Sequence, residues 1–260
     1  MGETGRLVAK LTGHGGRVWI AIYSSDGKRV VTASGDRTAR VWDAETGQLI
    51  AELKGHGDSV LSARYSPNGK KVVTASEDRT ARVWEAETGR LVAELKGHGD
   101  SVYSAIYSPD GKRVVTASGD RTARVWEAET GRLVAELKGH GDNVYSAMYS
   151  PDWKRVVTAS EDQTAKVWEA ETGRLVADLK GHEGRVVSAM YSPDGERVVT
   201  ASVDRTARMW DTSQEDRSAQ QIGKLLHCYL PFRFEPEDSN ALVLSIPYPA
   251  DCQTTAHSHL

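Results

Sequence analysis

Histidine, serine and aspartate recur together along this chain, and these three residue types can form the catalytic triad of a hydrolase. One such set is His98, Ser118 and Asp120. We do not expect a hydrolase, because an enzyme seldom needs five copies of one nucleophile and no Gly-x-Ser-x-Gly nucleophile turn is evident. The sequence therefore predicts no catalytic residue and no enzymatic activity.

Metal and cofactor chemistry is not predicted either. The recurring histidines are 42 residues apart, and Cys228 and Cys252 form no Cys-x-x-Cys pair. The glycines lie in repeated turns, and there is no phosphate-binding Gly-x-x-x-x-Gly-Lys-[Ser/Thr] motif. We expect neither a bound metal nor a cofactor.

The charge balance argues against a nucleic acid or a membrane as partner. The 260 residues carry a net charge of −3, and residues 1–211 hold equal numbers of acidic and basic side chains. No apolar run approaches the ~20 residues of a membrane helix. Two cysteines and the absence of a secretion signal predict a cytoplasmic protein.

The element that positions all these residues is an internal repeat. Gly-His and Trp-Asp or Trp-Glu pairs each recur every 42 residues, and residues 55–96 and 97–138 differ at only five positions. Five copies fill residues 13–211 without a linker. We therefore expect one array over residues 1–211 and a separate extension over 212–260.

Each copy reads as four short strands. In the third copy we expect strands at Val102–Ser108, Arg113–Ser118, Thr122–Trp126 and Arg132–Lys138, since each is rich in β-forming or alternating residues. A Ser-Pro-Asp-Gly turn separates the first two. No long helical period is present, so the array is predicted to be all-β.

These spaced Gly-His and Trp-Asp signatures resemble the WD-repeat family of β-propellers, whose blades are four-stranded sheets. Near-identical copies are also similar to the repeat arrays of bacterial signalling proteins. The resemblance implies a propeller of five four-stranded blades and a small C-terminal tail. In one copy Trp153 replaces the turn glycine, which predicts a distorted turn or an exposed ring.

The resemblance also assigns the His, Asp and Trp residues to a structural hydrogen-bond network inside each blade. The hydroxyl of the first copy comes from Ser34 or from Thr32. The network residues are His14, Asp36, Trp42, His56, Asp78, Trp84, His98, Asp120, Trp126, His140, Asp162, Trp168, His182, Asp204 and Trp210.

The resemblance further predicts how the array ends. Residues 3–9 match the turn and fourth strand at residues 129–135, whereas the array stops at Trp210 after a third strand. The strand at Arg6–Leu11 is therefore expected to complete the last blade and close a five-blade ring within one monomer. A homodimer is the alternative. The tail at 212–260 is expected to be a cap with a frayed end.

Positions at which the copies differ point to a binding surface, because residues that carry the fold should match between copies. By resemblance, three such sets fall on the top face of the propeller, where family members bind proteins or peptides. They are Trp19, Leu61, Tyr103, Tyr145 and Val187; Arg17, Ser59, Ser101, Asn143 and Arg185; and Gly35, Glu77, Gly119, Glu161 and Val203. Trp, Tyr and Arg are enriched at binding hot spots. Neutral drift is the competing interpretation.

Two other recurring sets are assigned no binding role. Ile22, Arg64, Ile106, Met148 and Met190 are predicted to line the channel or a seam between blades. Arg37, Arg79, Arg121 and Arg205 are interpreted as ordinary exposed turn residues, offset by acidic neighbours. We therefore predict a scaffold or sensor module that binds a protein or peptide. The alternative is a small-ligand or glycan binder with equivalent pockets on each blade.

Overall fold

The computed structural model describes residues 5–213, which form one compact unit. The predicted tail, apart from Thr212 and Ser213, lies outside the described residues. Nineteen strands and no helix are present in the described part, and they pair as five separate antiparallel sheets in chain order. The all-β prediction is confirmed.

The strands of each sheet follow the chain from the inside outwards. The first strands are β1 (Val18–Tyr23), β5 (Val60–Tyr65), β9 (Val102–Tyr107), β13 (Val144–Tyr149) and β17 (Val186–Tyr191). The second strands are β2 (Arg29–Ser34), β6 (Lys71–Ser76), β10 (Arg113–Ser118), β14 (Arg155–Ser160) and β18 (Arg197–Ser202). The third strands are β3 (Thr38–Asp43), β7 (Thr80–Glu85), β11 (Thr122–Glu127), β15 (Ala165–Glu169) and β19 (Ala207–Asp211). The fourth strands are β4 (Leu49–Lys54), β8 (Leu91–Lys96), β12 (Leu133–Lys138) and β16 (Leu175–Leu179).

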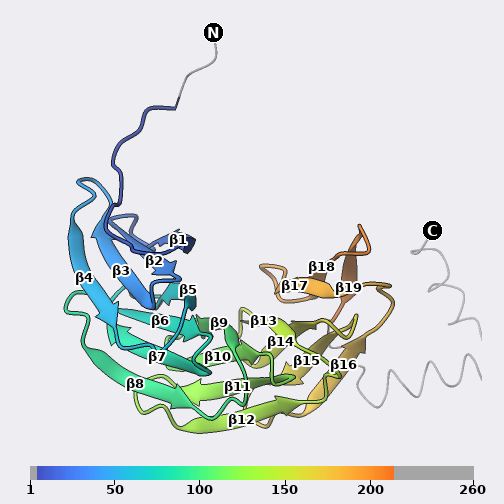
Figure 1. The fold of residues 1–260 in the computed structure, drawn as a ribbon. Helices are drawn as coiled ribbons and strands as arrows, with labels where there is room; N and C mark the ends of the chain where they lie inside the picture. The colour runs from blue at the N-terminus through green and yellow to red at the C-terminus, as the bar shows by residue number, and fades with distance from the viewer. Residues whose placement is uncertain (1–4, 214–260) are drawn as a thin grey trace, which may run out of the picture. The chain divides into compact units, whose positions relative to one another are not determined.

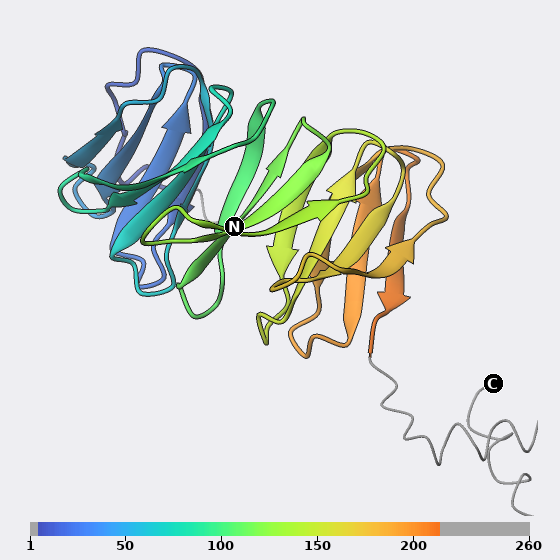
Figure 2. The same cartoon turned by 90° about the horizontal axis from the view of Figure 1, so that it is seen from below.

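The five sheets follow one another along an arc whose first and last sheets do not meet (Figure 1). Successive first strands contact each other, so β1, β5, β9, β13 and β17 lie on the inside of the arc. The same order is visible from below in Figure 2. Each sheet is thus one blade of a propeller-like array.

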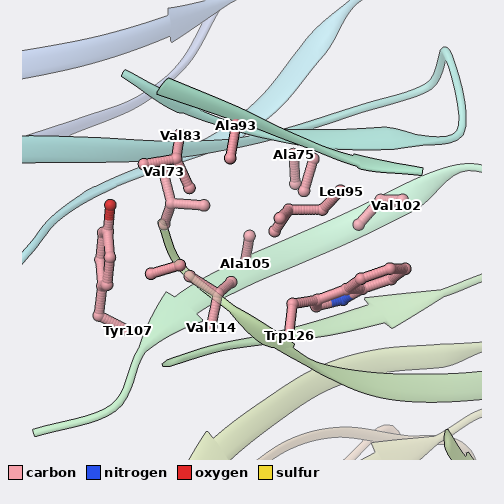
Figure 3. Packing of buried hydrophobic residues seen from close by; sticks show 12 residues of the cluster. Val73, Ala75, Val83, Ala93, Leu95, Val102, Ala105, Tyr107, Val114 and Trp126 are labelled. Carbon is pink, nitrogen blue, oxygen red and sulfur yellow. The ribbon is translucent and has the colours of Figure 1, made fainter. Parts of the chain in front are cut away.

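The core is divided among the junctions between blades. At the junction of the second and third blades, Val73, Ala75 and Val83 face Val114 and Trp126 (Figure 3). Equivalent clusters fill the other three junctions. Because adjacent blades bury each other's apolar faces, each blade depends on its neighbours for stability.

The last blade differs from the other four. Among residues 5–213 its sheet has three strands, β17, β18 and β19, whereas each of the others has four. The predicted closing strand at Arg6–Leu11 is not paired there in this structure. Instead, the Ala9 side chain lies beside Gly47 of the first blade, so the segment stays with that blade. Closure within one chain remains a prediction.

The substitution of glycine by Trp153 does not distort its turn. The Trp153 N–H donates to the Ser150 carbonyl at 2.9 Å, as the Gly111 N–H does to Ser108 at 2.8 Å. Trp153 adopts a left-handed φ of 53°, and its ring is 51% exposed. The second of the two predicted consequences, an exposed ring, is the one observed.

Candidate interaction surface

A chain of hydrogen bonds links the outer part of each blade to the loop before its first strand. In the third blade the Trp126 indole N–H donates to Thr116 Oγ1 at 2.8 Å, and this hydroxyl lies 2.7 Å from His98 Nε2. His98 Nδ1 in turn lies 2.8 Å from Asp120 Oδ2. A neutral His98 with its proton on Nδ1 satisfies the whole series, since Thr116 can then donate to Nε2.

The hydroxyl of this network belongs to threonine and not to serine. Ser118 Oγ accepts from the Asp120 N–H and donates to the Asp100 carbonyl, both at 3.1 Å, so it fixes the turn instead. The other blades repeat the contacts of Trp, Thr, His and Asp. The structure therefore brings together each predicted His, Asp and Trp.

Electrostatics fits a structural role for these clusters. Burial alone would raise the pKa of Asp120, but hydrogen bonds from His98, Thr122 and the Gly99 N–H lower it well below its ordinary value. Burial lowers the pKa of His98 and outweighs the opposing effect of Asp120. Thr116 is fully buried, and the His98 side chain is inaccessible as well. A substrate therefore has no path to this hydroxyl.

The first of the sets at which the copies differ, here called the divergent sets, occupies a β-bulge in each blade. It consists of Trp19, Leu61, Tyr103, Tyr145 and Val187. In the third blade Val102 pairs with Ser118 and Ser104 pairs with Ala117, so Tyr103 is an extra residue without a partner of its own. The other blades have the same irregularity. A bulge re-aims the side chain of its extra residue. The same side-chain position is therefore turned out of the sheet in all five blades.

The second and third divergent sets lie beside this bulge. The backbone N–H of Gly119 donates to the Ser101 carbonyl at 2.9 Å, and that of Glu161 donates to the Asn143 carbonyl at the same distance. Equivalent bonds join Gly35 to Arg17, Glu77 to Ser59 and Val203 to Arg185. All three sets thus lie at the end of the blades opposite the Ser-Pro-Asp-Gly turns. This end, lined by the three sets, is called the variable face below.

Two tyrosines on the variable face meet between the third and fourth blades. The rings of Tyr103 and Tyr145 are 5.6 Å apart and tilted by 45°. Tyr145 donates its hydroxyl proton to Glu161 at 2.6 Å, and the Asn143 amide donates to the same carboxylate oxygen at 2.9 Å. These two hydrogen bonds lower the pKa of Glu161. The result is a carboxylate held beside two half-exposed aromatic rings.

Trp19 lies apart from this pair, in the first blade. Its ring is 48% exposed and stacks under the Arg17 guanidinium, whose carbon is 5.0 Å from the ring centre. Leu61 is half-buried, and Val187 is 42% exposed. The structure therefore brings together predicted residues of the third and fourth blades, with Arg185 of the last blade close enough to act on Tyr145 and Glu161, and leaves Trp19 and Arg17 of the first blade apart.

The set of Ile22, Arg64, Ile106, Met148 and Met190 lies at the seams between blades, except in the last blade, where Met190 is 47% exposed. Ile22, Ile106 and Met148 pack against three of the junction clusters. Arg64 is partly buried, and burial lowers its pKa. The turn position that follows the variable face is exposed and left-handed in every copy. It is occupied by Arg37, Arg79, Arg121, Gln163 and Arg205.

Stacked antiparallel sheets, each held by one buried hydrogen-bond cluster, define the architecture of a propeller-type repeat protein. Five consecutive segments match the WD40 family (WD domain, G-beta repeat), at residues 5–43, 47–85, 89–127, 131–169 and 173–211. The chain therefore belongs to the WD40 family. Its repeats are offset from the blades by one strand, because each of the last four matches starts before a fourth strand and ends with a third.

Two curated relatives are similar to this chain over a segment about as long as one repeat. Eukaryotic translation initiation factor 3 subunit I of Caenorhabditis briggsae and that of Caenorhabditis elegans are each 46% identical over 43 residues, which is 16% of this chain. The matched segment spans 13% of the length of each relative. WD40 domains are generally non-enzymatic and generally mediate protein interactions.

The described part of the chain shows neither a membrane-spanning helix nor a cluster of metal ligands. No helix in the described part of the chain is long and apolar enough to cross a membrane. Within residues 5–213 no three His, Cys, Asp or Glu side chains gather as metal ligands. Cys228 and Cys252 lie outside the described residues.

Proposed function

We propose that this protein is a non-enzymatic scaffold that binds a protein or peptide on its variable face. The observation that carries the proposal is the pair of Tyr103 and Tyr145 beside Glu161, because the blades differ in side chain here and agree in backbone. Tyrosine adds apolar contact area at low cost in side-chain entropy, and its hydroxyl supplies a polar contact.

The chemistry of the surface indicates what kind of segment would bind. Glu161 is ionised, since hydrogen bonds from Tyr145 and Asn143 and the charge of Arg185 lower its pKa, and the Tyr145 hydroxyl that it holds belongs to the paired rings. A lysine or arginine side chain placed there would gain both a carboxylate partner and an aromatic face. We infer that the partner presents a basic side chain to this part of the face, in competition with Arg185, whose charge already acts on Glu161.

Five equivalent ligand pockets, as a glycan binder would need, have no specific observation in their favour. The bulge carries Trp, Leu, Tyr, Tyr and Val in successive blades, so a ligand would meet a different surface in each. The two relatives carry the name of a translation initiation factor subunit, which is compatible with a place in a multi-protein complex. A sensor role and a cytoplasmic location remain predictions.

Affinity capture tests this function. The full chain and a variant with Trp19, Tyr103 and Tyr145 changed to alanine would be immobilised, and lysate proteins retained by each would be quantified by mass spectrometry. A matched control changes Asn68, Asp110 and Asp194, in the turns at the opposite end of the blades, to alanine. We expect a partner that the parent and the control retain and the triple variant loses. Equal retention by all three would contradict the proposal.

A further inference from the structure

The four junctions between blades use the same two surfaces each time. We call the side of a blade toward the next blade its forward side and the opposite one its backward side. On the forward side of the second blade, Val73 and Val83 are fully buried against the third. On the backward side of the third blade, Val102 is fully buried and Tyr107 is 6% exposed. At all four junctions, the forward side of one blade is therefore covered by the backward side of the next.

At the two ends of the arc one surface of each kind is uncovered. On the forward side of the last blade, Met209 is 77% exposed and Val199 is 37% exposed, although the residues at these positions in the other blades are fully buried. On the backward side of the first blade, Val18 is 46% exposed and Tyr23 is 66% exposed. Exposed apolar faces of this kind mark interaction sites.

The strand inventory is complementary as well. Gly47 and Gly89 are equivalent glycines in the turns of the first and second blades, and each packs closely against the chain before it. A Cβ atom added to Gly47 would lie 2.9 Å from Ala9 Cβ, and one added to Gly89 would lie 2.6 Å from the carbonyl oxygen of Glu52 in β4. The segment around Ala9 therefore occupies, beside the first blade, the place that β4 occupies beside the second. It has the place of a fourth strand but forms no strand pairing in one copy, whereas β19 is a third strand whose outer edge is unpaired within residues 5–213.

A charge pair recurs across three of the four junctions, and its two halves also stand at the two ends of the arc. The first residue of the second strand pairs with a glutamate of the next blade, as in Arg29 with Glu87 at 2.5 Å and Arg113 with Glu171 at 2.9 Å. By the 42-residue repeat, Arg197 and Glu45 hold the two halves of this pair. Both are exposed, and neither forms an ion pair with another described residue.

We propose that a second copy of this chain covers each end, in a head-to-tail contact that repeats the junction between blades. The backward side of the first blade of one copy packs on the forward side of the last blade of the next. Residues 7–11 then pair with β19 as its fourth strand, and Glu45 meets Arg197. Heterologous contacts that do not close build open helical chains. Because one arc already curves through more than half of a turn (Figure 1), joined copies must rise along the axis as such a chain.

A second copy fits these ends better than closure within one chain. All four junctions are already packed, with several fully buried residues at each. Packed interfaces are not continuously deformable, so bringing the first and last blades together would require repacking every junction. A second copy requires no change in any of them.

The test blocks one end at a time in the full chain. Met209→Asp places a charge on the forward end, and Tyr23→Asp places one on the backward end; both side chains are exposed in a single copy, so both variants are expected to fold. By light scattering we expect the parent to be larger than 28.4 kDa and each variant to be a monomer of that mass. Mixed in equal amounts, the two variants should form a one-to-one complex of twice that mass, because each supplies the end that the other lacks.

A matched control and a charge exchange complete the experiment. Leu133→Asp, at an exposed position of the central blade, should associate as the parent does. Glu45→Arg or Arg197→Glu alone should weaken association about two- to fivefold, the range for an exposed pair, and the double variant should restore it. A parent that is monomeric at every concentration, together with no complex in the mixture, would overturn the proposal. Monomeric variants with lowered melting temperatures would then indicate closure within one chain.

Discussion

At the scale of the residue, the most informative group is the buried threonine that joins Trp to His in every blade. Thr116 is fully buried, accepts from Trp126 and lies against His98 Nε2. A catalytic hydroxyl would have to meet a substrate, and this one cannot. The same three residue types that suggest a hydrolase triad in the sequence therefore tie two parts of one sheet together.

Removing the hydroxyl while keeping the side-chain shape tests this role. Thr116→Val leaves the Trp126 N–H and His98 Nε2 without a partner, so we expect a loss of about 1–3 kcal/mol in the free energy of unfolding. Trp126→Ala should cost more, about 3–5 kcal/mol, because it also leaves a cavity. Urea unfolding measures both. Thr12→Val, in an exposed segment before the first strand, is the control and should change stability by less than about 0.5 kcal/mol.

The aspartates of the network make stability depend on pH. The folded-state pKa of Asp120 lies below its value in the unfolded chain, so the folded state binds fewer protons. This stabilisation is complete above the unfolded pKa of about 4 and is lost as the pH falls below it toward the folded value. We expect unfolding free energies to fall between about pH 5 and pH 3. Asp120→Asn should reduce that slope, and an unchanged slope would contradict the assignment.

At the scale of the element, each turn and each strand face is set by its place in the blade. The left-handed turn position holds Gly27, Gly69, Gly111 and Gly195 in four copies, with φ between 68° and 76°, and Trp153 in the fifth. A side chain in this region costs about 1–2 kcal/mol, which glycine avoids. The fold tolerates this strain because the turn hydrogen bond is still formed.

Restoring the glycine should therefore stabilise the protein. We expect Trp153→Gly to increase the free energy of unfolding by about 1 kcal/mol and to raise the melting temperature in calorimetry. Trp153→Ala keeps the strained φ and removes only an exposed ring, so it should have little effect. Destabilisation by the glycine would show that the Trp153 ring contributes to packing.

Equivalent positions in different blades give a second test of the junctions. Val83 and Met209 occupy the same repeat position, but Val83 is fully buried against the next blade and Met209 is 77% exposed. Val83→Ala should cost about 1–3 kcal/mol, whereas Met209→Ala in the isolated monomer should cost less than about 0.5 kcal/mol. Equal losses in urea unfolding at low protein concentration would contradict the open arrangement of the arc.

The sequence predicted the regular parts of this fold closely, since five copies act as their own alignment. Arg113–Ser118 has the predicted bounds, and β9 and β12 each differ by one residue at one end. The bulge at Tyr103 could not be predicted, because one extra residue leaves no mark on the length of a repeat that always contains it. The choice of threonine over serine could not be predicted either. Thr116 and Ser118 are two residues apart and therefore lie on the same face of the strand, so alternation does not decide which hydroxyl meets the histidine.

At the scale of the whole molecule, the repeat gives two kinds of surface. The forward and backward sides of the blades are nearly identical between copies, and they pack on each other. The variable face differs from blade to blade on an unchanged backbone, so it can differ in what it binds without a cost to the fold. Whether the arc closes could not be predicted from the sequence, because closure depends on the angle between packed blades and not on the number of repeats.

The most direct test of the central claim measures binding to the variable face by calorimetry, with one purified partner recovered by affinity capture. Changing Trp19, Tyr103 and Tyr145 to alanine should leave unfolding within roughly 1 kcal/mol per site and weaken binding by at least about 2 kcal/mol in total. The control with Asn68, Asp110 and Asp194 changed to alanine should bind as the parent does. Equal affinity of the parent and the triple variant would contradict the account and leave drift as the explanation of the variable face.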